Sequence, residues 1–196
     1  MENLRYRQVH MDFHTSQYIT EIGKDFDAER FAERLERAHV DSVTCFARCH
    51  HGWLYYPSVN HPELIHPNLE NRNLLLEQIE ACHKRGIRVP VYTTVRWDEL
   101  VIREHPEWLC RDEHGNPVDK GNVPEPHFYY DICLNSGYRE FFKEHLRDII
   151  GLRGGWRNGN NAARAAACPS PVPAHHRRDS LCPETAAACR QRVLRL

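Results

Sequence analysis

Short apolar segments alternate with amphipathic segments over the first 150 residues. The apolar segments, rich in β-branched and aromatic residues, predict strands at 7–13, 41–47 and 88–95. Apolar residues at helical spacing predict helices from Asp27, over 73–85, and from Ser136 to about Ile150. The polar segment between residues 105 and 118 is expected to turn around His114-Gly-Asn-Pro117.

Two of these helices have recognisable ends. Asp27 can cap the free N–H groups of its first turn, with Phe26 and Phe31 at the hydrophobic-staple positions. Gly86 followed by Ile87 is typical of a Schellman stop, because glycine adopts the left-handed conformation at low cost.

Strands that alternate with helices require parallel pairing with right-handed crossovers, hence an α/β fold. We expect the N-terminal portion of a (β/α)8 TIM-type barrel, with about three to four βα units. The strand-to-helix loops are long and rich in His, Trp and Tyr, as on the catalytic face of such barrels. A doubly wound sheet is the rival, but the chain contains neither Gly-rich phosphate-binding motif.

The composition changes at Gly151. Residues 1–150 carry 18 Lys and Arg against 25 Asp and Glu, whereas residues 151–196 carry 8 Arg against two acidic residues. We therefore expect a partial barrel over 1–150 and a non-homologous Arg/Ala/Pro-rich tail over 151–196. The tail is either a segment read out of frame or a disordered extension. A zinc module from Cys168, Cys182 and Cys189 ranks last, because their spacing matches no common pattern.

The overall charge limits the partners. A formal net charge of −1 argues against a nucleic-acid or anionic-membrane partner. The N-terminus lacks a signal-like apolar stretch and no run approaches 18 apolar residues, so a cytoplasmic location is expected. Five irregularly spaced cysteines precede residue 150, and in a cytosolic chain they should be reduced.

The strongest candidate chemistry follows the second predicted strand, where the chain reads His50-His51-Gly52-Trp53 with Tyr55-Tyr56. Imidazoles donate and accept hydrogen bonds, which suits sugar hydroxyls, and aromatic faces suit the C–H faces of a pyranose. The alternative is a loop whose aromatics only cover the barrel top, with His51 bonded to backbone. The spacing leaves both interpretations open.

Polar and aromatic residues also follow the other two strands. His14 follows the first strand, and Arg96 and Trp97 follow the third. Three neighbouring strand ends of this kind favour a shared site in a barrel. The simpler alternative pairs Arg96 with Asp98 or Glu99 and makes Trp97 a packing anchor.

A metal site is considered because the chain has 14 histidines. His10, Asp12 and His14 alternate along one predicted strand, and Cys45 and Cys49 precede the histidine pair. No C-x2-C pair exists, so we expect no metal and no cofactor.

Several segments resemble known glycoside hydrolases. Residues 35–53, including His-His-Gly-Trp, and residues 77–93 are similar to a strand–loop and a helix–strand segment of α-L-fucosidase-type enzymes. Asp12-Phe-His14 resembles the first-strand histidine of that group. The set of Asp-Phe-His-Thr-Ser, His-Pro-Glu-Trp and Cys-Leu-Asn-Ser-x-Tyr-Arg-Glu resembles a hypothetical glycosyl hydrolase family over residues 5–150.

The resemblance implies a retaining-type glycosidase barrel with a carbohydrate substrate. By the same resemblance His14, His50 and His51 contact substrate hydroxyls, and Trp53 and Trp97 are stacking candidates. The fucosidase run His-His-Asp-Gly lacks its Asp here, since Gly52 follows His51 directly. That departure leaves fucose specificity open.

The larger departure lies after residue 150. In these families a Val-Asp-Gly strand follows and delivers the nucleophilic carboxylate, but here the chain reads Gly-Leu-Arg-Gly-Gly-Trp-Arg. Codons compatible with residues 152–157 give Tyr-Glu-Val-Asp-Gly when read one base later. A frameshifted, truncated barrel with little turnover is the resulting hypothesis.

The predicted substrate-binding set is His14, His50, His51, Trp53, Tyr55, Arg96 and Trp97. Neither catalytic carboxylate is assigned, because both are expected on later strands, and nothing promotes Asp12, Asp98 or Asp131. The alternatives are a non-catalytic carbohydrate-binding protein and a metal-dependent hydrolase or isomerase on the same barrel. Sugar identity and oligomeric state are not readable from the sequence.

Overall fold

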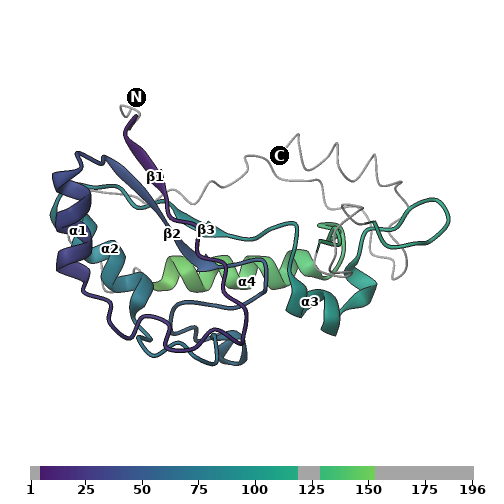
Figure 1. Cartoon of the computed structure of the whole chain (residues 1–196). Coiled ribbons are helices and arrows are strands. Elements are labelled where there is room, and N and C mark those ends of the chain that lie inside the picture. The colour runs from purple at the N-terminus through teal and green to yellow at the C-terminus, as the bar shows by residue number, and fades with distance from the viewer. Residues whose placement is uncertain (1–4, 119–128, 153–196) are drawn as a thin grey trace. The chain divides into compact units, whose positions relative to one another are not determined.

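The computed structural model describes residues 5–118 and 129–152 of the chain (Figure 1). Among them, the residues up to Thr94 and from Glu144 onward form one compact unit, and those from Val95 to Lys143 form a second. Apart from Gly151 and Leu152, the predicted tail lies outside the described residues.

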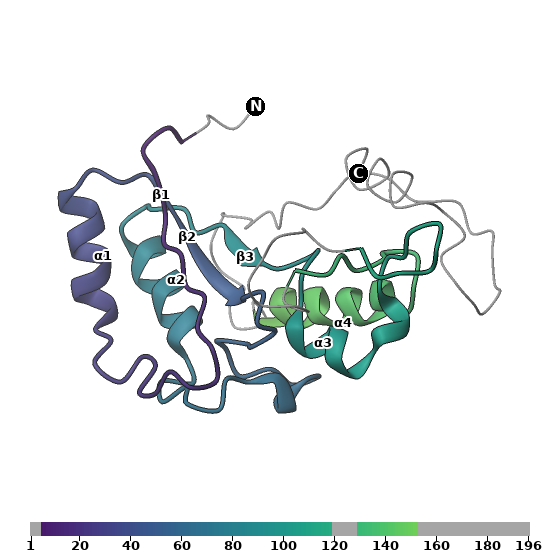
Figure 2. The same ribbon diagram turned by 45° about the vertical axis from the view of Figure 1, so that its right-hand side comes forward.

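The first unit contains a parallel sheet with its crossover helices. Its elements are β1 (Gln8–His10), α1 (Ala28–Arg37), β2 (Ser42–Arg48), the 3₁₀ turn η1 (Pro62–Leu64), α2 (Leu74–Lys84) and β3 (Val91–Thr93). The strands lie in the order β1-β2-β3, and both pairings are parallel. Figure 2 shows α1 and α2 side by side next to this sheet. The predicted α/β alternation with parallel strands is confirmed.

The helix ends follow from local sequence. The Asp27 carboxylate accepts the Arg30 N–H at 2.9 Å, and the rings of Phe26 and Phe31 lie 5.5 Å apart. At the end of α2, the Ile87 N–H donates to Cys82 O and the Gly86 N–H donates to His83 O. Gly86 has a φ of +68°, so the predicted capping and Schellman stop are both confirmed.

The first and third strands are shorter than predicted. β1 ends at His10, so the prediction that His10, Asp12 and His14 alternate along one strand is wrong. Pro90 has no N–H to donate, and β3 begins only after it, although Pro90 O still accepts the Cys45 N–H at 3.1 Å.

One face of β2 is fully buried and includes Val43, Cys45 and Ala47. Burial raises the pKa of the Cys45 thiol well above its usual range and that of Cys82 on α2 to about 11. The five cysteines of the described residues are buried free thiols. They act there as small core residues.

The second unit contains α3 (Glu99–Glu104), the 3₁₀ turn η2 (Pro106–Trp108) and the first residues of α4 (Tyr138–Gly151). α3 was not predicted, because six residues are too few to show helical periodicity. Asp98 caps it by accepting the Val101 N–H at 3.1 Å. The expected turn is present, since Asp112 accepts the N–H groups of His114 and Asn116.

No helix in the described part of the chain is long and apolar enough to cross a bilayer.

Candidate functional site

Two histidines meet where β1 and β2 end. His14 lies four residues after β1 and His50 lies two residues after β2. Their rings stack with centroids 3.7 Å apart and an interplanar angle of 16°. Since parallel strands end at the same edge of a sheet, the two loops are held together at that edge.

The polar contacts of His14 indicate its tautomer. Its Nδ1 accepts the His50 N–H at 3.5 Å, and its Nε2 lies 3.2 Å from Asp12 Oδ1. These partners fit a neutral ring with the proton on Nε2. Burial lowers the pKa of His14 from its ordinary value and outweighs the opposing effect of Asp12. The ring is therefore a hydrogen-bonding group rather than a fixed positive charge at neutral pH.

His51 extends the stack, with its ring 5.1 Å from that of His50 and tilted by 47°. Three imidazoles from two loops therefore lie next to one another. The side chain of His14 is 21% exposed, and His50 and His51 are half-buried. Partly exposed imidazole rings can hydrogen-bond with a polyhydroxylated ligand.

An aromatic pair on the sheet supports these rings. Phe46 of β2 and Tyr92 of β3 are register partners and stack at 4.1 Å. His14 meets both edge-on, at 5.1 and 5.8 Å, and His10 also packs edge-on against Phe46 at 5.4 Å. Sequence reasoning did not assign Phe46 or Tyr92 to the site. The signal available in the sequence was that Phe46 and Tyr92 are aromatic residues of neighbouring predicted strands.

The loop after β2 is shaped by a glycine and an arginine. Gly52 has a φ of +96°, a region that favours glycine, and its carbonyl accepts the buried Arg48 Nε at 3.1 Å. The Gly52 N–H in turn donates to Cys49 O at 3.0 Å, which closes a tight turn around the histidine pair. Gly52, which follows His51 directly, thus shapes the turn itself.

Two aromatic residues predicted to bind substrate are packed in the protein. Trp53 is half-buried against the core of the first unit, with its ring 5.7 Å from His66. Tyr55 is 1% exposed, and its hydroxyl lies 2.7 Å from Thr15 Oγ1. Tyr55 also accepts the Thr15 N–H at 3.2 Å. It therefore ties the loop after β1 to the loop after β2.

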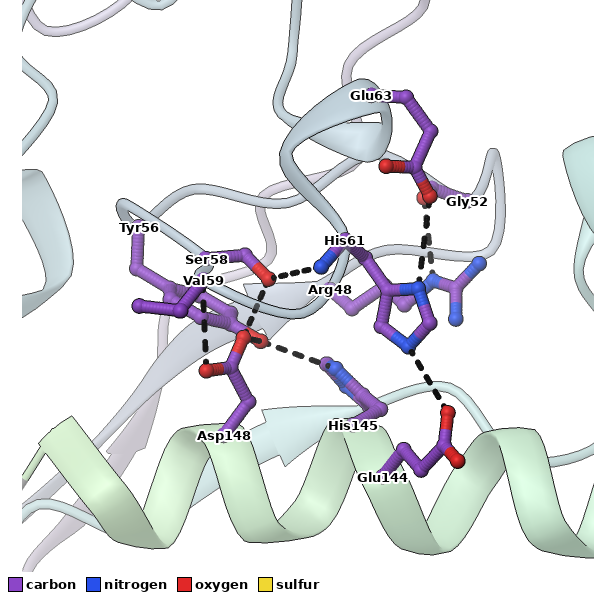
Figure 3. Close-up of polar contacts among 10 residues, drawn as sticks. All are labelled: Arg48, Gly52, Tyr56, Ser58, Val59, His61, Glu63, Glu144, His145 and Asp148. Carbon is purple, nitrogen blue, oxygen red and sulfur yellow. Dashed lines mark hydrogen bonds and ion pairs between the residues drawn. The ribbon is translucent and has the colours of Figure 1, made fainter.

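Further along the β2 loop, a buried polar cluster joins it to α4 (Figure 3). The Asp148 carboxylate accepts hydrogen bonds from Ser58 Oγ and, at 3.4 Å each, from the Tyr56 hydroxyl and the Val59 N–H. The Tyr56 hydroxyl also lies 3.1 Å from His145 Nδ1. Sequence reasoning missed His145 and Asp148, although they continue the helical spacing set by Tyr138 and Phe141.

One set of hydrogen-bond directions fits every partner in this cluster. Thr93 Oγ1 donates to His145 Nε2 at 2.7 Å, and His145 Nδ1 donates to the Tyr56 hydroxyl. Tyr56 then donates to Asp148, which as a carboxylate only accepts. Burial lowers the pKa of His145 well below its ordinary value, which keeps the ring neutral as this arrangement requires.

Arg96 and Trp97 share a partner in the second unit. Asp131 is buried and accepts both Arg96 Nε at 2.5 Å and Arg96 Nη2 at 2.7 Å. Trp97 Nε1 donates to the same carboxylate at 3.1 Å. The sequence also offered Asp98 and Glu99 as partners of Arg96; the structure pairs Arg96 with Asp131, and Asp98 caps α3.

Over residues 5–118 and 129–152, no three or more His, Cys, Asp or Glu side chains are grouped so that they could hold a metal ion.

Known proteins match this chain over most of its described length. The α-L-fucosidase isoenzyme 2 from Paenibacillus thiaminolyticus is 44% identical, with a TM-score of 0.66 over 75% of this chain and 22% of that chain. The chain thus spans about a fifth of the length of that fucosidase.

Two more distant structures are also matched. One is a Ruminococcus gnavus fucosidase variant in complex with fucose, at 22% identity and a TM-score of 0.48 over 74% of this chain and 29% of that chain. The other is a maltogenic α-amylase from Thermotoga neapolitana, at 17% identity and a TM-score of 0.46 over 71% and 35%. No curated protein is a significant match.

The family assignment comes from residues 27–154, which match the model of hypothetical glycosyl hydrolase 6. This confirms the resemblance inferred from the sequence motifs. The chain belongs to the hypothetical glycosyl hydrolase 6 family.

Proposed function

We propose that this chain forms the opening βα units of a glycoside hydrolase barrel similar to α-L-fucosidases, and that its first unit binds a sugar. The observation that carries this proposal is the contiguous set of His14, His50 and His51 rings beyond β1 and β2. The family match and the 44% identity to a fucosidase support it.

In this proposal the three imidazoles hydrogen-bond the hydroxyls of one saccharide unit. A neutral His14 ring offers a donor on Nε2, and its Asp12 partner is exposed at the surface. Trp53 remains a proposed stacking residue. Trp97 belongs to the second unit, where its indole N–H donates to Asp131, and it is not part of the site proposed in the first unit. Tyr55 is too buried to reach a sugar, so we assign it to positioning Thr15 and not to the direct contact predicted from the sequence.

Catalysis would need a pair of carboxyl groups, about 5 Å apart in a retaining enzyme. Two of the acids near the loops already have structural partners, since Asp98 caps α3 and Asp131 binds Arg96. We therefore place the nucleophile and the acid/base on later strands of the parent barrel.

The second candidate is a carbohydrate-binding protein without turnover. It is favoured by the same partners of Asp98 and Asp131, because a buried cap and a bidentate ion pair leave these acids poorly placed for proton transfer. Both candidates predict sugar binding. Only the glycosidase predicts product release, and only for the intact parent barrel that carries both carboxylates.

The test is calorimetric titration of the full chain with L-fucose, beside an assay of 4-nitrophenyl α-L-fucoside cleavage. We expect binding that His14→Ala weakens about tenfold, roughly the effect of one lost hydrogen-bonding partner. His114→Ala is the control, because His114 is an exposed histidine in the turn of the second unit. Binding without cleavage is the result expected of this chain under both candidates, because the catalytic carboxylates are proposed on later strands. Cleavage by the chain would contradict the second candidate and this placement of the carboxylates. Absence of binding contradicts both.

A further inference from the structure

The loop between β1 and α1 presents two apolar side chains to solvent. Tyr18 is 82% exposed and its neighbour Ile19 is 50% exposed. Burying such side chains would stabilise the fold. They lie four and five residues after His14, on the loop that carries it.

The backbone on both sides of Tyr18 is fixed by side chains from a distant segment. His66 Nε2 donates to Ser16 O at 2.9 Å, and the Asn68 side-chain amide donates to Gln17 O at 2.8 Å and Ile19 O at 3.0 Å. The Ile19 N–H closes the turn by donating to Ser16 O at 3.0 Å. We call His66 and Asn68 the clamp.

The polar atoms of the clamp have hydrogen-bond partners of their own. His66 is fully buried, and its Nδ1 accepts the Asn68 N–H at 3.1 Å while its Nε2 serves Ser16. Burial lowers the pKa of His66, which agrees with the neutral tautomer that these contacts need. A buried imidazole is tolerated only when both nitrogens are bonded. His66 and Asn68 thus hold the backbone on both sides of the exposed Tyr18 in place.

We propose that Tyr18 is a stacking platform for a second saccharide unit, the one attached to the sugar at His14, His50 and His51. This inference rests on the proposed function. Tyr18 follows the carboxyl end of β1, as His14 does, and four residues span at most about 14 Å. That is within the reach of a short oligosaccharide. A tyrosine ring offers an apolar face for sugar C–H groups and a polar tip for hydroxyls.

The fixed turn strengthens the case for a ligand. A tyrosine on a mobile loop would lose both backbone and side-chain entropy on binding, whereas on a clamped backbone mainly the rotamer freedom of the side chain remains to be lost. Residues that bind ligands are commonly carried on loops held by a rigid scaffold. The occupant is a carbohydrate in this proposal because the platform extends the sugar site proposed at His14, His50 and His51.

The experiment titrates the full chain with L-fucose and with 2′-fucosyllactose, whose additional sugars can reach the platform. We expect the trisaccharide to bind about five- to tenfold more tightly, and Tyr18→Ala to remove this gain while the affinity for L-fucose stays unchanged. Tyr18→Phe should keep the gain. Asn68→Ala should reduce it, because the carbonyls of Gln17 and Ile19 lose their donor.

Tyr6→Ala is the matched control. Tyr6 is 86% exposed but precedes β1, at the opposite end of the strand, so its loss should change neither affinity. Equal affinities for the two sugars, or equal losses in the Tyr6 and Tyr18 variants, would overturn the platform. If the chain binds neither sugar, both the proposed function and the Tyr18 platform are contradicted. Binding of L-fucose without a Tyr18-dependent gain overturns the platform alone.

Discussion

The imidazole rings of His14 and His50 lie almost parallel, 3.7 Å apart, although 36 residues separate them in the chain. One ring follows β1 and the other follows β2, so the stack fixes the position of one strand-end loop against the other. It also shields His14 from water, and burial is the main cause of its lowered pKa.

The stack leads to a prediction about protonation. His50→Ala removes the ring that covers His14, so the pKa of His14 should rise toward the ordinary value of 6.5. Following the Cε1–H resonance of His14 against pH by NMR measures this directly. His114→Ala should leave the titration of His14 unchanged. An unaltered His14 titration in His50→Ala would show that the stack is not what buries the ring.

The cluster on α4 predicts a large loss of stability when its carboxylate is removed. Asp148→Ala leaves Ser58, Tyr56 and Val59 without their buried acceptor, and we expect the free energy of unfolding to fall by about 2–3 kcal/mol. Arg147→Ala, on the exposed side of the same helix, should change it by less than about 0.5 kcal/mol. Urea unfolding compares the two. Equal losses of unfolding free energy in the two variants would show that the Asp148 carboxylate does not stabilise the fold as a buried acceptor.

Stability should decrease as the solution becomes acidic. His14, His66 and His145 have lowered pKa values in the folded protein, so the unfolded chain takes up protons more readily than the fold does. Their contribution is complete above about pH 6.5 and is lost as the pH falls below that value. Each histidine contributes a slope of at most about 1.4 kcal/mol per pH unit.

His145→Gln isolates one part of this slope. Glutamine can still bond Tyr56 and Thr93 but does not titrate, so unfolding experiments between pH 7 and 5 should show a shallower decrease. The same substitution tested against His114→Gln separates the buried ring from an exposed one. An identical slope in wild type and His145→Gln would contradict the neutral state assigned to this residue.

The Arg96–Asp131 pair predicts a smaller effect. The Asp131 side chain is 5% exposed but that of Arg96 is 42% exposed, so water screens part of the interaction. We expect Asp131→Asn to lower the free energy of unfolding by about 1–2 kcal/mol. Because Trp97 donates to the same carboxylate, its fluorescence should change as well. Unchanged stability together with an unchanged spectrum would count against this arrangement.

The composition change at residue 151 predicts a feature of the gene. Reading the DNA one base later from codon 152 should restore a Val-Asp-Gly segment and continue as barrel coding. Sequencing this region in all three frames tests the frameshift hypothesis. A verified reading frame with no barrel coding in either alternative frame would refute it.

The elements with local signals were predictable from the sequence. The cap at Asp27, the stop at Gly86 and the alternation of strands with helices all depend on neighbouring residues, and the structure has them. The lengths of β1 and β3 were overestimated, because apolar composition does not show which N–H groups find a partner. Pro90 interrupts exactly that pairing in β3.

The contacts of the site were only partly predictable. His14, His50 and His51 were identified because each follows a strand, but their stacking needed three-dimensional geometry. His145 and Asp148 were missed, since polar residues on the buried side of a helix break the expected pattern. Their partners lie some 90 residues away, on the β2 loop. Sequence periodicity cannot reveal bonds over such separations.

In the proposed site, three imidazoles from two loops form one sugar-binding surface. A ¹H–¹³C NMR spectrum of histidine-labelled protein, recorded during titration with L-fucose, tests this surface. We expect saturable shifts of the His14, His50 and His51 ring resonances with one common Kd, while His114 stays fixed. Ring resonances of His14, His50 and His51 that stay fixed at saturating sugar, or that follow different binding curves, would contradict it.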